Sequence, residues 1–178
     1  MRAGYFLLEI VIVLGVSVLV GCVCAVSLRG WYSRMLVQAH ARMLAHRLRS
    51  TALRACLQRA RICMYFDDKK QGYTINNQFI AFPPHVVYGG SYARSGANGV
   101  KKVVFGPPSQ PHKPLVSYIS FPKKTIYFYP DGSSSAGVVY IGHVASPVLY
   151  GISCGVGSDC FVRVYSYVAE RWKIYTEY

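Results

Sequence analysis

An apolar run near the amino terminus constrains this chain more than any other feature. It extends from Gly4 to Leu28 and reads GYFLLEIVIVLGVSVLVGCVCAVSL. From Tyr5 onward, its only charged residue is Glu9. A helix over residues 5–28 would be about 36 Å long at about 1.5 Å per residue, enough to cross the hydrocarbon core of a bilayer with some tilt. The sequence therefore predicts a membrane-spanning helix over residues 5–28.

The carboxylate of Glu9 needs a compensating group inside such a helix. An acid costs about 2.5–3.5 kcal/mol at the centre of a bilayer and less near its ends. If the chain were cut after Gly4, the new amino terminus at Tyr5 would lie four residues before Glu9, on the same face of the helix. We therefore expect the carboxylate to pair with an ammonium group of its own chain or of a neighbour.

These first residues resemble the type III signal of type IV pilins and pseudopilins. A short basic leader ends in a glycine, and an aromatic residue, apolar residues and a glutamate follow, in the order Met1-Arg2-Ala3-Gly4-Tyr5-Phe6-Leu7-Leu8-Glu9. The resemblance implies that a prepilin peptidase removes residues 1–4 by cleaving between Gly4 and Tyr5, and methylates the amino group of Tyr5. It also implies that Glu9 sets the register between subunits of a filament. Tyr5 departs from the phenylalanine that is usual in the family, although it is also aromatic.

Two other membrane-bound interpretations remain open. In the first, the chain is a lipoprotein, because Leu19-Val20-Gly21-Cys22 fits a lipobox. Against it, Glu9 would lie in the apolar core of the signal, and the apolar run continues past Cys22. In the second, the chain is an ordinary single-pass protein. Four arginines follow the anchor within about 20 residues, so the positive-inside rule places the remainder of the chain in the cytoplasm. The pilin resemblance instead implies a bacterial inner-membrane protein with its carboxy-terminal domain in the periplasm or outside the cell.

The segment 29–61 continues the helix and is strongly basic. It contains eight arginines and no acid, and so supplies much of the net charge of +13. Apolar residues recur at helical spacing at Val37, Ala41, Leu44, Leu48, Ala52, Ala55 and Cys56. This periodicity predicts one helix from about residue 5 to 61 whose second half packs against a sheet, while Arg42, Arg49 and Arg54 point mostly away. The arginines fit anionic lipid, acidic partner subunits or nucleic acid, or form a solvated face.

Residues 62–178 predict an antiparallel sheet domain. Short β-rich runs lie between Gly, Pro and Asp turn signals. They predict strands at 62–66, 73–76, 78–82, 85–88, 100–105, 117–121, 125–129, 138–141, 160–167 and 171–175. The expected fold class is α+β and pilin-like, with one long amino-terminal helix followed by one antiparallel sheet.

A second family resemblance lies in residues 125–141. A strand leads into Pro130-Asp131-Gly132, a loop of small residues and another strand. This order is similar to the carboxy-terminal signature of H-type minor pseudopilins of type II secretion and of FimT-like pilins. It implies a non-enzymatic subunit that assembles with sibling subunits into a type II secretion pseudopilus or a type IV pilus. In the final hairpin, Glu170-Arg171 stands where the family usually has a glycine, and residues 86–120 do not match.

The sequence offers few candidates for chemistry. We expect no cofactor and no metal, since Asp67 and Asp68 lack further oxygen ligands at calcium spacing. Asp131 has the position of a turn residue rather than a catalytic one. Cys154 and Cys160 flank a glycine-rich loop that a disulfide could close outside the cytoplasm. The chain's fifteen tyrosines, with Lys101-Lys102 or Lys123-Lys124 beside them, leave open a DNA-binding minor pilin.

Overall fold

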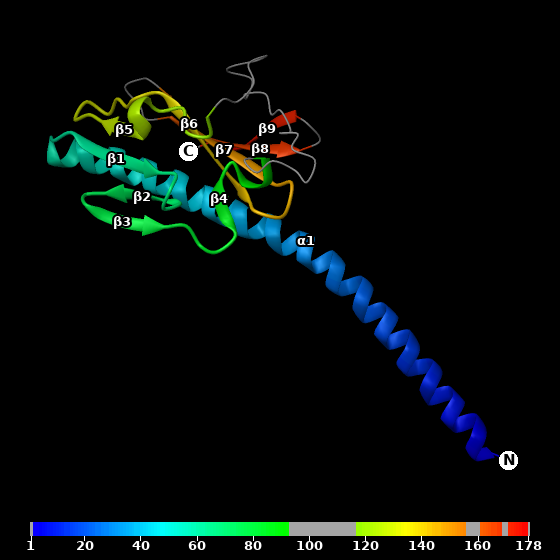
Figure 1. Ribbon diagram of the computed structural model, residues 1–178. Coiled ribbons are helices and arrows are strands. Elements are labelled where there is room, and N and C mark those ends of the chain that lie inside the picture. The colour runs from blue at the N-terminus through cyan, green and yellow to red at the C-terminus, as the bar shows by residue number, and fades with distance from the viewer. Residues whose placement is uncertain (1, 93–116, 156–160, 169–170, 178) are drawn as a thin grey trace.

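The computed structural model describes residues 2–92, 117–155, 161–168 and 171–177. One helix, α1, runs from Arg2 to Gln58. Nine strands and two short 3₁₀ helices follow it: β1 (Ile62–Asp67), β2 (Gly72–Ile75), β3 (Gln78–Ala81), β4 (Val86–Tyr88), η1 (Gly90–Tyr92), η2 (Pro122–Lys124), β5 (Thr125–Phe128), β6 (Gly137–His143), β7 (Leu149–Cys154), β8 (Val162–Val168) and β9 (Arg171–Glu177). The expected α+β arrangement is therefore present (Figure 1).

The strands form two antiparallel sheets rather than the one sheet that the sequence predicts. The first has the order β3-β2-β1-β5 and the second has the order β4-β6-β7-β8-β9. The chain changes sheet three times, between β3 and β4, between β4 and β5, and between β5 and β6. A pattern of strands and turns along the sequence gives no information on these changes of sheet.

The second half of α1 is the spine that joins the two sheets. It packs on β1 and β5 of the first sheet and on β6, β7 and β8 of the second. The apolar stripe predicted by its periodicity is confirmed, because the stripe from Val37 to Ala55 is buried, with exposed fractions of 0 to 4 %, and only Cys56 is intermediate. Arg42, Arg49 and Arg54 are exposed, also as predicted.

The helix ends three residues before the predicted boundary. Arg59 adopts a left-handed backbone conformation, with φ of 50°. The N–H of Ala60 donates to the carbonyl oxygen of Ala55 at 3.2 Å, which closes the helix as in a Schellman motif. At its other end, α1 includes residues 2–4, which the pilin resemblance assigns to a leader.

One predicted strand is absent, and one strand of the structure was not predicted. The run 117–121 makes only an isolated bridge, Ile119 to Val139, since Pro122 begins a 3₁₀ turn and cannot donate to a ladder. Conversely, β7 was not predicted, although it is a central strand of the second sheet. The predicted strand at 100–105 lies outside the described residues.

Candidate functional site

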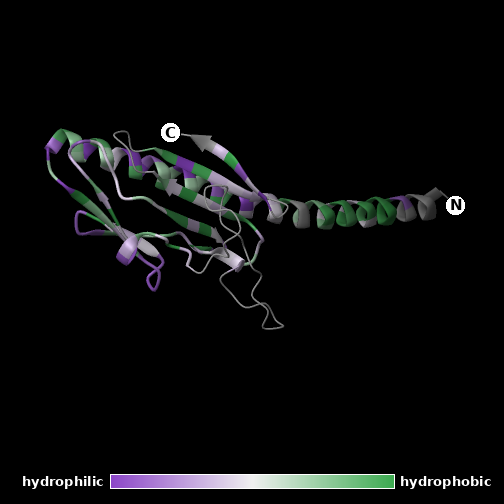
Figure 2. Cartoon of the chain, turned by 90° about the horizontal axis from the view of Figure 1, so that it is seen from above, coloured by the Kyte–Doolittle hydropathy of each residue, from purple (hydrophilic) through white to green (hydrophobic). Residues whose placement is uncertain are grey.

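The first half of α1 projects from the sheets and contacts neither of them. From Ile10 onward its large apolar residues whose burial is described are exposed, and none of its most apolar 18-residue stretch, of mean hydropathy 2.8, is buried. Figure 2 shows this stretch in green, extending away from the domain. By length and composition, the helix can cross a membrane. The hydroxyl of Ser17 donates a hydrogen bond to the carbonyl oxygen of Val13 at 2.7 Å, so this donor is satisfied within the helix, as an apolar environment requires.

Aromatic residues mark the end of this exposed segment. Trp31 and Tyr32 follow Leu28 and are 59 % and 62 % exposed. Arg34 is exposed two residues further on, and Ser33 is the first residue of the helix described as buried. Tryptophan, tyrosine and arginine are favoured where a helix leaves a bilayer, because they join apolar bodies to polar ends. The sheet domain therefore begins where such a boundary would lie.

The predicted cleavage site lies in the first turns of α1. Gly4, Tyr5 and Glu9 belong to one uninterrupted helix, so Tyr5 and Glu9 are one turn apart on one face, as the sequence predicts. The lipobox residue Cys22 is exposed in the middle of the same helix.

The turn signature Pro130-Asp131-Gly132 connects β5 to β6. The carboxylate of Asp131 accepts hydrogen bonds from the N–H of Ser133 at 2.9 Å and from its hydroxyl at 2.7 Å. These bonds hold the pKa of Asp131 below its usual value. Gly132 has φ of 84°, a conformation that glycine adopts without strain. The geometry gives Asp131 the structural role that the sequence predicts.

The two family signatures are not brought together by the fold. Phe128, just before the turn, is paired with Ile62, just after the carboxyl end of α1. Figure 1 places β5 at the end of the domain farthest from the amino terminus. The Gly4–Glu9 segment and the turn are therefore separate features at opposite ends of the molecule, and neither completes a site for the other.

The predicted disulfide can be described at one end only. Cys154 ends β7 and is 3 % exposed. Its sulfur lies 3.2 Å from the hydroxyl of Ser134, which also donates to the carbonyl oxygen of Gly155 at 3.0 Å. Cys160 lies outside the described residues, so its pairing with Cys154 stays a prediction.

Two arginines of α1 contact tyrosine side chains, and these contacts were not predicted from the sequence. Arg42 lies over the ring of Tyr175, 5.0 Å from its centroid, and also donates to its hydroxyl. Arg47 lies over the ring of Tyr73 and donates to its hydroxyl at 2.8 Å. Such cation–π contacts hold a guanidinium group in place without neutralising its charge. The sequence hints at such contacts because the helix has many arginines and no nearby acids, and the chain is rich in tyrosine. The spacing of these residues does not identify which arginine contacts which tyrosine.

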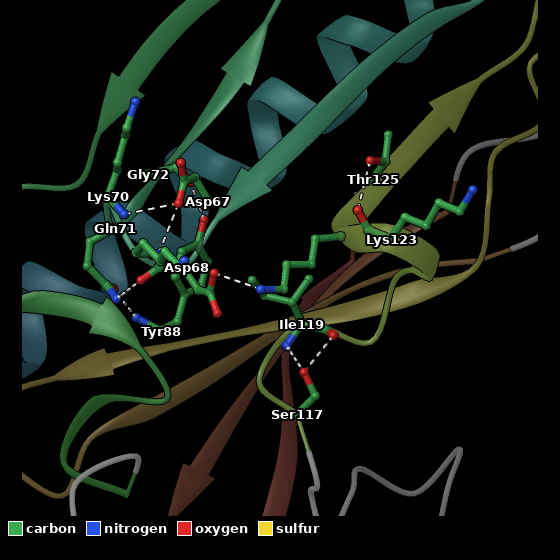
Figure 3. A network of polar contacts seen from close by, with 12 residues as sticks. Asp67, Asp68, Lys70, Gln71, Gly72, Tyr88, Ser117, Ile119, Lys123 and Thr125 are labelled. Carbon is green, nitrogen blue, oxygen red and sulfur yellow. Dashed lines mark hydrogen bonds and ion pairs between the residues drawn. The ribbon is translucent and has the colours of Figure 1, made fainter.

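A polar network joins the turn between β1 and β2 to the second sheet (Figure 3). The ammonium of Lys124 lies 2.7 Å from the carboxylate of Asp68 and lowers the pKa of that carboxyl group. Nearby, the side-chain oxygen of Gln71 accepts from the N–H of Tyr88 at 2.8 Å, and the Tyr88 hydroxyl donates to Gly72. Asp68 is thus engaged in a structural ion pair.

Asp67, the neighbouring acid, caps the turn. Its carboxylate accepts from the backbone N–H groups of Lys69 and Lys70 at 3.0 and 3.1 Å. Within the described part of the chain, no three His, Cys, Asp or Glu side chains gather as a metal-binding group. The geometry of this turn is therefore accounted for by local backbone bonding.

In comparisons with protein-family models, curated proteins and solved structures, nothing matches this chain. Any assignment of function consequently rests on the residues and geometry described above.

Proposed function

We propose that the chain is a non-enzymatic minor pilin or pseudopilin, which acts by assembling into a type II secretion pseudopilus or type IV pilus. One observation supports the proposal most strongly. A single helix has an exposed apolar first half, and its second half is the buried spine of a sheet domain. This division lets the first half pack in a membrane or among sibling helices while the domain stays folded. Its exposed small and apolar residues suit both environments.

The position of Glu9 gives the proposal its mechanism. Tyr5 and Glu9 are one helical turn apart, so an amino group created at Tyr5 would lie near the carboxylate of its own chain or of a neighbour. In an apolar surrounding, such a pair is retained because either charge alone is costly. The prepilin peptidase would create this amino group, and the inner membrane would hold the subunit before assembly, with its sheet domain outside the cytoplasm.

The mature amino terminus tests the class of protein. The full chain is expressed in a bacterium that has a prepilin peptidase, purified from membranes and measured by intact mass. A methylated chain that begins at Tyr5 is expected. A lipid on Cys22 would instead identify a lipoprotein, and a retained leader would contradict processing as a pilin.

The role of Glu9 is tested by assembly. Glu9→Leu should leave membrane insertion intact and strongly reduce recovery in sheared filaments or in cross-links with sibling subunits. Ser17→Ala is the matched control, because it changes a polar residue of the same helix whose hydroxyl is bonded within that helix. Normal assembly of Glu9→Leu would contradict the mechanism.

A further inference from the structure

A polar groove lies between α1 and the hairpin formed by β2 and β3, away from the anchor and from the turn signature. It encloses about 320 Å³. The helix contributes two arginines, a serine and a threonine to its walls, and the hairpin contributes two amide and two isoleucine side chains: Arg47, Ser50, Thr51, Arg54, Ile75, Asn76, Gln78 and Ile80. None of these features takes part in the proposed assembly through Glu9.

The helix wall of the groove is positively charged. Arg54 is exposed, and Arg47 is half-buried and held by the ring and hydroxyl of Tyr73. Burial raises the pKa of Tyr73, so its hydroxyl stays neutral and does not cancel the charge of Arg47. The sequence has no acid between Glu9 and Asp67, and among the described residues no acidic side chain lines the groove. The helix wall is therefore positively charged and suited to an anionic ligand.

The hairpin wall of the groove ends in a sheet edge that no other described strand pairs with. β3 is the outer strand of its sheet (Figure 1), and three of its four side chains are exposed. The two-residue loop Asn76–Asn77, with φ of 48° and 64°, makes Ile75 and Gln78 the hydrogen-bonded pair next to the turn. Bonded pairs alternate along an antiparallel ladder, so the N–H and C=O groups of Phe79 and Ala81 face outward.

We propose that this groove binds an extended acidic segment of a partner protein, which adds to β3 as a further strand and places carboxylates against Arg47 and Arg54. Strand addition uses the outward backbone groups for affinity, and alternate side chains enter the groove for specificity. The two arginines are seven residues apart, or about 10.5 Å along the helix axis. Acids two or four residues apart in a strand are about 7 or 14 Å apart, which long arginine side chains can bridge.

The chemistry favours an acidic peptide over other anions. A carboxylate matches the fork of a guanidinium group, and a peptide supplies the N–H and C=O groups that an open edge lacks. Inorganic phosphate and nucleic acid could satisfy the arginines, but they could not continue the ladder of β3. The inference holds for the folded domain and does not depend on cleavage at Gly4.

Binding is tested with the full chain in a non-ionic detergent. The probe is a short dye-labelled peptide of alternating threonine and glutamate, measured by fluorescence anisotropy at several salt concentrations. We expect saturable binding that weakens with salt. Arg54→Gln should weaken it about tenfold, the effect of losing one charge-assisted hydrogen bond. Arg49→Gln is the matched control, because Arg49 is exposed on the same helix but does not line the groove.

A second peptide separates strand addition from charge. Methylation of alternate backbone nitrogens along one edge preserves every carboxylate but removes the N–H groups that would pair with β3. This peptide should bind much more weakly than its parent. Equal binding of the two peptides, equal losses in the two arginine variants, or no binding at all would overturn the proposal. Displacement by phosphate or DNA as effective as by the parent peptide would also overturn it, since the groove would then be a general anion site.

Discussion

Replacing Leu48 with alanine should destabilise the sheet domain by about 2–5 kcal/mol. Leu48 is fully buried on the stripe of α1 that packs against both sheets, between Leu44 and Ala52. The substitution removes three carbon atoms, worth about 2.4 kcal/mol in transfer free energy at about 0.8 kcal/mol each. The remaining cost comes from the cavity that the substitution leaves, because a helix packed against two sheets cannot easily shift to fill it. This loss is a large fraction of the 5–15 kcal/mol typical of a whole domain.

The assay must follow the sheets and not the helix alone, because we expect the exposed apolar half of α1 to stay helical in detergent. Urea unfolding of the full chain is therefore monitored by near-UV circular dichroism of the buried tyrosines. Leu53→Ala is the matched control: the same chemical change, five residues further along the same helix, at a side chain that is 58 % exposed. It should change stability by about 0.5 kcal/mol or less. Equal destabilisation by the two variants would refute the role of α1 as the spine of the domain.

Three further predictions concern the stability of the folded domain. Gly142→Ala should destabilise the domain by about 1–3 kcal/mol in the same urea assay, because its Cβ would lie 2.6 Å from the carbonyl oxygen of Val148; wild-type stability would contradict that close approach. Tyr73→Phe should cost about 1 kcal/mol, since Arg47 loses its hydroxyl acceptor but keeps the ring; a gain in stability would argue against the bond. Burial and Arg47 lower the pKa of His40 below 6.5 in the folded protein. As the pH falls, the imidazole of His40 is therefore protonated in the unfolded chain before it is protonated in the folded one. Thermal stability should therefore decrease below about pH 6.5, and His40→Gln should reduce this decrease; an unchanged pH profile of the variant would rule out His40 as its source.

The long helix could be predicted because its period is determined by local geometry. The stripe from Val37 to Ala55 repeats every three or four residues, and each of those residues is buried. Hairpins with strong turn chemistry, such as Asp67–Gly72, were also predicted correctly for the same reason.

The elements that were missed depend on contacts between distant parts of the chain. β7 is buried along nearly its whole length, so it lacks the alternation of a half-exposed strand, and Gly151 interrupts its β-rich character. The run 117–121 has that β-rich character but pairs through one bridge only. The division into two sheets and the Arg–Tyr contacts likewise depend on which strands pack against α1. A local sequence pattern does not determine that packing.

The groove beside β3 was not predicted for a related reason. The arginines of α1 and the hairpin loop at Asn76–Asn77 are each evident in the sequence, as separate features. Their juxtaposition follows only once the hairpin folds back along the helix.

The continuity of α1 through Gly30 has a mechanical consequence. The helix has no break between its exposed and buried halves. The direction in which each side chain of the exposed half points, around the helix axis, is therefore fixed relative to the sheets. Inserting one residue near Gly30 would turn the anchor by about 100° and lengthen it by about 1.5 Å, whereas inserting seven would nearly restore its phase. In the proposed filament, the packing of the apolar half of α1 would therefore determine which side of the sheet domain faces each neighbouring subunit.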